Sequence, residues 1–157
     1  MKKTCTVCGT SYYYSPADPV SFTLEPPVCS GKCFQQLLME HLETSDQFEI
    51  FSDDNILLLS KSYLYRNKFE EQVAIQLRRL SYYINYEQLL FKPCLYVPDF
   101  MVTLPSSNGV VFLEAKGIWA DGAHKKVRAF REWLQERGTD IYLIDAEIYR
   151  RIASDKH

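Results

Sequence analysis

The feature that most constrains the fold is a pair of apolar segments, LYVPDFMVTL and VVFLEAKG, separated by the turn signal PSSNG. Segments rich in β-branched and aromatic residues predict strands, and a short Pro, Ser, Asn and Gly run between them predicts a hairpin. Pro98 is compatible with a strand near its start or at a sheet edge. The stretch from Tyr96 to Trp119 therefore predicts two antiparallel strands.

The segments around this hairpin predict an α/β domain. Apolar residues at helical spacing predict a helix in KFEEQVAIQLRRL, and DGAHKKVRAFREWLQERG predicts a second helix that stops at Gly138. YYINYEQLLF and TDIYLIDA predict one strand each. A strand, a helix and a strand in succession favour a parallel pair. We therefore expect a mixed central sheet flanked by helices.

Three charged residues stand inside the predicted hairpin, where charges are costly. Side chains alternate along a strand, so Glu114 and Lys116 share one face, and the hairpin brings Asp99 close to Glu114. Two neighbouring carboxylates repel each other unless a cation lies between them. Glu70, at the border of the helical apolar stripe, leans towards the sheet and can supply a third carboxylate. The pattern predicts a divalent metal site that suits phosphodiester hydrolysis.

The stretch from Tyr65 to Ala146 resembles the PD-(D/E)xK nucleases, and within them the phage endonuclease I branch of Holliday-junction resolvases. The resemblance is carried by FEEQVAIQL, YVPDF, FLEAKGIW and HKKVRAFRE. It implies a restriction-endonuclease-like core in which Glu70, Asp99 and Glu114 bind Mg²⁺ or Mn²⁺ and Lys116 is the catalytic lysine. It also implies a homodimer that cleaves branched DNA in the cytoplasm of a phage-infected or bacterial cell.

A short basic run follows the hairpin. Lys125, Lys126 and Arg128 lie on the second predicted helix, and we expect them to contact DNA phosphates. A solvated basic face is the plainer interpretation of the same residues.

Other interpretations of the acidic residues stay open. Asp99 after a proline is typical of a turn, and Glu114 with Lys116 is compatible with a surface ion pair. The alternatives to a junction resolvase are a nicking or double-strand endonuclease of a transposition or defence system, and an inactive DNA-binding or protein-binding module.

Four of the five cysteines form two close pairs, CTVC and CSGKC. Four thiolates at this spacing predict a closed, structural zinc site, and Gly9 after the first pair with a helix starting at the second indicates a treble-clef-like finger. The predicted ligands are Cys5, Cys8, Cys29 and Cys33, which leaves Cys94 as a free thiol. The tyrosines between the pairs form either an aromatic core strand or a surface that stacks on nucleic-acid bases.

The chain therefore divides into a zinc module at 1–43, a connecting strand and turn segment at 44–66, and a nuclease core at 67–157. Its net charge of −2 gives no overall positive field, so any DNA binding must be local. No apolar run approaches the roughly 20 residues of a membrane-spanning helix, and the N-terminus lacks the apolar region of a secretory signal. We expect an intracellular protein without a membrane partner.

Overall fold

The structure is a computed structural model, which describes residues 2–13, 25–44, 47–59, 65–104, 109–115 and 123–153, with the backbone alone at 47, 48, 123 and 124. The helices are α1 (Gly31–Thr44), α2 (Gln47–Ile50), α3 (Lys68–Arg79), α4 (Ala123–Gln135) and α5 (Ala146–Ala153). The strands are β1 (Lys2–Thr4), β2 (Ser11–Tyr13), β3 (Ile56–Leu58), β4 (Tyr83–Tyr86), β5 (Leu89–Phe91), β6 (Phe100–Thr103), β7 (Val111–Ala115) and β8 (Ile141–Ile144).

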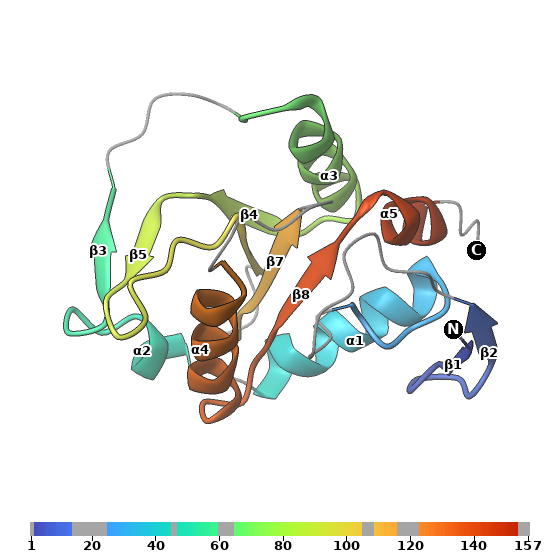
Figure 1. Cartoon of the computed structure of the whole chain (residues 1–157), viewed down its shortest axis with the longest axis horizontal. Coiled ribbons are helices and arrows are strands. Elements are labelled where there is room, and N and C mark those ends of the chain that lie inside the picture. The colour runs from blue at the N-terminus through green and yellow to red at the C-terminus, as the bar shows by residue number, and fades with distance from the viewer. Residues whose placement is uncertain are drawn as a thin grey trace.

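A four-stranded sheet of order β4-β6-β7-β8 forms the centre of the molecule (Figure 1). β6 pairs with β4 and with β7 in antiparallel register, and β8 lies parallel to β7. The chain returns from β7 to β8 through α4, which therefore runs back along the sheet. The prediction of a mixed α/β fold is confirmed.

Alternation along β7 assigns its side chains to two cores. Val111, Leu113 and Ala115 pack in a cluster with residues of α1, α3 and α5. Phe112 packs in a second cluster with Val127, Phe130 and Leu134 of α4. Helices therefore cover both faces of the sheet, and all five side chains of β7 are buried. The predicted split between Phe112 on one face and Val111, Leu113 and Ala115 on the other is confirmed.

Two predicted strands were too long. YYINYEQLLF divides into β4 and β5, which belong to different sheets, because the backbone turns at Glu87 with a φ of 48°. The next strand begins only at Phe100, after a turn in which Leu95 has a φ of 50°. Cys94 thus lies in this turn, half-buried, and not in a buried strand.

The connecting segment contains more structure than the turn and strand predicted for it. A single helical turn, α2, precedes the turn at Asp53 and Asp54, and β3 then pairs with β5 in a separate two-stranded sheet. After β8 the chain forms α5, which the sequence analysis did not predict. Asp145 caps this helix, because its Oδ1 accepts a 2.8 Å hydrogen bond from the Ile148 N–H.

The helix that begins at the second cysteine pair belongs to the main core. Phe34, Leu38 and Leu42 of α1 are buried in the cluster that also holds Leu113 and Ile148. α1 contacts both β7 and α5. The hydrophobic core is therefore continuous across the predicted boundary at residue 43.

Gly109, just before β7, shows how close this packing is. A Cβ atom at this position would lie 1.9 Å from the carbonyl oxygen of Leu42, near the end of α1. Only glycine fits such a backbone approach. Among the helices that the structure describes, none is long and apolar enough to cross a membrane.

Candidate functional site

The first cysteine pair lies in a tight hairpin between β1 and β2. The Cys5 N–H donates to the Thr10 carbonyl at 2.8 Å, and the Gly9 N–H donates to the Cys5 carbonyl at 2.9 Å. Gly9 has a φ of 80°, a conformation that glycine adopts without strain. The Cys8 N–H points to the Cys5 sulfur at 3.5 Å. This turn therefore presents two sulfurs on one side of the hairpin.

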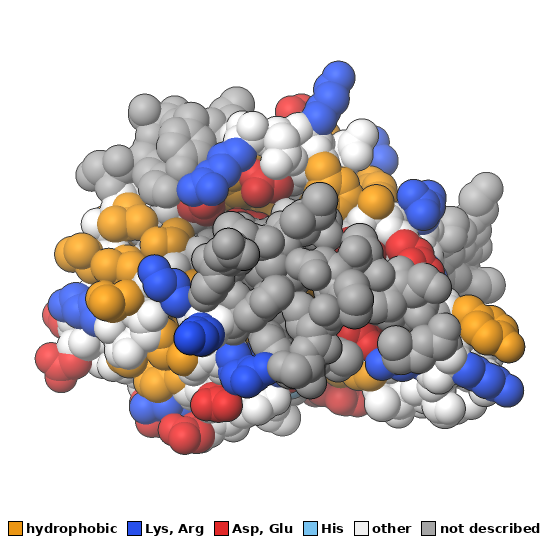
Figure 2. All heavy atoms as spheres, in the orientation of Figure 1, with side chains coloured by type: hydrophobic (Ala, Val, Ile, Leu, Met, Phe, Trp, Pro, Cys, Tyr) orange, Lys and Arg blue, Asp and Glu red, His pale blue; other side chains and the backbone are white. Residues whose placement is uncertain are grey.

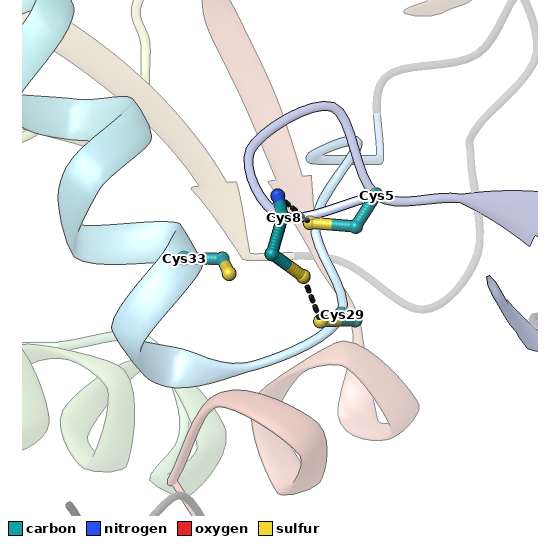
Figure 3. Close-up of side chains that lie close together, drawn as sticks. All are labelled: Cys5, Cys8, Cys29 and Cys33. Carbon is teal, nitrogen blue, oxygen red and sulfur yellow. Dashed lines mark hydrogen bonds between the residues drawn. The ribbon is translucent and has the colours of Figure 1, made fainter. Parts of the chain in front are cut away.

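The second cysteine pair stands at the start of α1. Cys29 precedes the helix and Cys33 lies in its first turn, where the Cys33 N–H donates to Ser30 Oγ at 3.3 Å. Figure 3 shows all four side chains pointing towards one another. Their sulfurs all lie within 4.8 Å of one another, and the Cys8 and Cys29 sulfurs are 3.5 Å apart.

This arrangement could bind a metal ion such as zinc. Four thiolates at about 2.3 Å from a tetrahedral zinc ion lie roughly 3.8 Å from one another, which agrees with the observed cluster. Hydrogen bonds with Thr10 lower the pKa of Cys8 to about 6, whereas burial and hydrogen bonds with Cys8 and Cys5 raise the pKa of Cys29 to about 12. Close thiols oppose one another's ionisation, and a cation removes that opposition.

A second candidate site lies where the β6–β7 ladder ends. The last paired residues of these strands are Phe100 and Leu113, so Asp99 and Glu114 occupy the next opposing positions. Beyond the paired residues, backbone N–H groups donate to carboxylate oxygens and not to the backbone carbonyls of a β-ladder. Glu114 Oε1 accepts from the Asp99 N–H at 2.8 Å, and Asp99 Oδ2 accepts from the Ala115 N–H at 2.9 Å. Both carboxylates are buried, with exposed fractions of 3% for Asp99 and 1% for Glu114.

A further buried carboxylate, Glu87, extends this pair into a row. Tyr86 is opposite Phe100 in the β4–β6 register, and the Glu87 N–H donates to the Asp99 carbonyl at 3.0 Å. The Glu87 carboxylate accepts from Arg66 Nη2 at 2.8 Å. Glu87 was not among the predicted site residues, because YYINYEQLLF was assigned to one continuous strand. We name Glu87, Asp99 and Glu114 the acidic row.

Glu70, which we expected at the border of the apolar stripe, is buried and lies beside Tyr86. Asn67 caps α3 by accepting from the Glu70 N–H at 2.9 Å, which fixes the first turn of the helix. Glu70 Oε2 then accepts from the Tyr86 hydroxyl and from the Arg66 N–H. Within the described residues, the four cysteines are the one group of three or more Cys, His, Asp or Glu side chains that could hold a metal ion. Glu70 as a third metal ligand stays a prediction.

Burial and the neighbouring carboxylates raise the pKa values of two tyrosines, Tyr96 and Tyr86. Burial, the charge of Glu114 and a hydrogen bond with it raise the pKa of Tyr96 far above its ordinary value, and the charges of Asp99 and Glu87 add to the effect. Burial and a hydrogen bond to Glu70 raise the pKa of Tyr86 in the same way. Both phenols therefore stay protonated at neutral pH, and each can donate a hydrogen bond to a carboxylate.

The predicted basic residues lie on the exposed side of α4. Lys125, Lys126 and Arg128 are exposed, whereas Val127 and Phe130 between and beyond them are buried against the sheet. Because α4 runs back from the end of β7, its first turns lie at the end of the sheet that carries Glu114. Lys116, the predicted catalytic lysine, lies outside the described residues.

No protein-family model matches this chain, and no curated protein is significantly similar to it.

Proposed function

We propose that this protein is an endonuclease that uses Mg²⁺ or Mn²⁺ to hydrolyse phosphodiester bonds, with a preference for branched DNA such as four-way junctions. The observation that carries the proposal is the pairing of Asp99 with Glu114 at the end of the β6–β7 ladder. Each carboxylate is buried, and each accepts a hydrogen bond from a backbone N–H of the opposing strand. The preference for branched DNA rests on the resemblance to junction resolvases.

The donor chemistry of this pair fits a hard divalent cation. A carboxylate has two oxygens, so Asp99 and Glu114 can each accept a backbone N–H and still coordinate an ion. Two buried carboxylates that lie close together repel each other unless a cation lies between them. A divalent cation bound there neutralises charge on a phosphate and lowers the pKa of a water molecule. Asp99 and Glu114 would hold that cation.

The remaining residues have supporting roles in this proposal. Glu70 is the third acid, oriented by the Tyr86 hydroxyl, and Lys116 would orient the attacking water and add positive charge at the phosphate. Lys125, Lys126 and Arg128 would bind phosphates along the approach to Glu114. Two copies of the chain, acting as a homodimer, would make the paired incisions that resolution of a four-way junction requires.

The cysteine cluster has a structural role in this account. Zinc bound by Cys5, Cys8, Cys29 and Cys33 would join the β1–β2 hairpin to the first turn of α1. Because α1 packs on β7, the metal would stabilise the layer that covers one face of the catalytic sheet. A site with four protein ligands leaves no position for substrate, so zinc would not take part in the cleavage reaction.

The substrate is tested by incubating zinc-loaded protein and Mg²⁺ or Mn²⁺ with an end-labelled four-way junction, a linear duplex of the same arms, and a single strand. We expect paired, symmetric cuts in the junction and slow or no cutting of the duplex. Equal rates on junction and duplex would replace the resolvase with a duplex endonuclease. Intact DNA in every reaction would overturn the proposal and favour an inactive binding module.

A further inference from the structure

The β1–β2 hairpin has an outer face that the proposed function does not use. In its register Lys2 is opposite Tyr13, and Thr4 is opposite Ser11. All four side chains are exposed, and the Tyr13 ring, with 75% of its surface exposed, is the most exposed of the large hydrophobic side chains in the described part of the chain. We name Lys2, Thr4, Ser11 and Tyr13 the ribbon face.

The other face of the hairpin is fixed to the body of the protein. Lys3 forms a 2.6 Å ion pair with Glu25, which is nearly buried. The guanidinium of Arg151, on α5, lies 4.7 Å from the centre of the Tyr12 ring. Arg151 also donates to the carbonyls of Val28 at 3.4 Å and Tyr13 at 3.5 Å. The ribbon face is therefore presented on a rigid support.

The chemistry of the ribbon face fits a nucleotide. An aromatic ring stacks on a base of any type, an ammonium group contacts a phosphate, and the Thr4 and Ser11 hydroxyls can donate to phosphate or sugar oxygens. Side chains opposite each other on paired strands have Cβ atoms about 4.5–5.5 Å apart, so one nucleotide can place its base on Tyr13 and its phosphate near Lys2. No residue of this face is acidic, which removes the main source of repulsion for a phosphate.

We propose that the ribbon face binds unpaired nucleotides of DNA, with a base stacked on Tyr13 and a phosphate contacting Lys2. Paired bases are stacked inside the duplex and leave no face for Tyr13, so the surface selects single-stranded segments or open branch points. At the right of Figure 2, where Figure 1 places β1 and β2, an apolar side chain lies beside Lys or Arg side chains. The choice of DNA as the bound nucleic acid rests on the proposed function.

Binding is measured by fluorescence anisotropy of a labelled single-stranded oligodeoxynucleotide, with Ca²⁺ in place of Mg²⁺ so that cleavage does not interfere. We expect Tyr13→Ala to weaken binding about 5- to 150-fold, the effect of losing one base stack. Tyr13→Phe keeps the ring and should bind like wild type. The matched control is Tyr83→Ala, because Tyr83 is also an exposed tyrosine, 61% exposed, but lies on β4. It should leave the affinity unchanged.

Salt dependence tests the lysine separately. Each phosphate contact to a single strand contributes about 0.7 to the slope of log affinity against log salt concentration, so Lys2→Ala should lower the slope by about that amount. Zinc content, measured for every variant, shows whether the hairpin is intact.

These outcomes separate this inference from the proposed function. If Tyr13→Ala and wild type bind the single strand equally, the inference is wrong, whether or not the protein cleaves DNA. Equal losses for Tyr13→Ala on single strand and on blunt duplex would also overturn it, because the contact would then not select unpaired bases. Glu114→Gln is expected not to cleave DNA, so Tyr13→Ala is also measured in that background. A loss of affinity for the single strand, without the same loss for the duplex, would support binding by the ribbon face independently of catalysis.

Discussion

The carboxylates of Asp99 and Glu114 each accept a hydrogen bond from a backbone N–H on the other side of the β6–β7 pair. The Asp99 N–H donates to Glu114 Oε1 at 2.8 Å, and Asp99 Oδ2 accepts from the N–H of Ala115, the residue after Glu114, at 2.9 Å. The positions of the two carboxylates therefore follow from the register of β6 and β7. A backbone N–H is a fixed donor, so the backbone on each side of this strand pair helps to position the carboxylate on the other side.

Substitutions at Asp99 should separate its structural role from its charge. Asp99→Asn keeps an oxygen that can accept from the Ala115 N–H, whereas Asp99→Ala leaves that buried donor without this acceptor. We expect the alanine variant to have a free energy of unfolding about 1–3 kcal/mol lower than the asparagine variant. Urea denaturation followed by circular dichroism measures the difference. Equal stabilities would mean that the hydrogen bond from Ala115 contributes nothing.

Cysteine substitutions should distinguish the metal centre from the free thiol. Cys29→Ser removes one of the four clustered sulfurs, so the zinc content should fall from about one ion per chain to nearly none, and the thermal midpoint should fall with it. The control is Cys94→Ser, because Cys94 lies in the turn before β6 and outside the cluster. Elemental analysis gives the zinc content. Unchanged zinc in Cys29→Ser would refute the metal centre.

Lys125 and Lys126 on α4 should each contribute a defined phosphate contact to DNA binding. Lys125→Ala and Lys126→Ala should each weaken binding to duplex arms and reduce the slope of log affinity against log salt by about 0.9, the value for one phosphate contact. Arg79→Ala removes an equally exposed positive charge at the far end of α3 and serves as the control. Titrations at several salt concentrations provide the slopes. A similar loss in all three variants would indicate a general charge effect, with no defined contact on α4.

Alkaline pH should unfold the protein through its buried tyrosines. Burial raises the pKa of Tyr82 from an ordinary value of 10.0 to about 12, so the fold favours the neutral phenol. A raised folded-state pKa means that this contribution to stability is present below pH 10 and is lost as the pH rises towards 12. Tyr82→Phe cannot ionise and should unfold at a higher pH than wild type. Circular dichroism across a pH titration shows the transition, and identical midpoints would exclude Tyr82 as a contributor.

The periodic elements could be predicted from the sequence because local patterns determine them. The stripe of α3 indicated that Glu70 faces the sheet, and its exposed fraction is 4%. Alternation in β7 separated Phe112 from its neighbours, and the spacing of the cysteines indicated the cluster that the structure contains. For α3 and β7, the residues that decide the structure lie within a few positions of one another. The two cysteine pairs lie farther apart, with Cys29 21 positions after Cys8, but each pair is recognisable from its own short spacing.

The turn at Glu87 could not be predicted in the same way. YYINYEQLLF contains neither glycine nor proline, and apart from Asn85, Glu87 and Gln88 its residues are aromatic or aliphatic, as in a strand. The break depends on contacts with distant residues, because Glu87 bonds to Asp99 through its backbone and to Arg66 through its side chain. The acidic row is therefore visible only after β4 and β6 are paired. α5 carried a readable signal in Asp145, which precedes Ile148 and Ile152 at capping and helical spacing.

The role of Glu114 in catalysis is tested by the single-turnover rate at which wild type and Glu114→Gln cleave a four-way junction in Mg²⁺. Glutamine keeps an oxygen for the Asp99 N–H and removes the charge, so the variant should stay folded and bind the junction. Glu71→Gln, which removes an exposed carboxylate on α3, is the control. We expect cleavage by wild type, a similar rate for Glu71→Gln, and a rate at least about 100-fold lower for Glu114→Gln. A Glu114→Gln rate equal to that of wild type would contradict this role of Glu114.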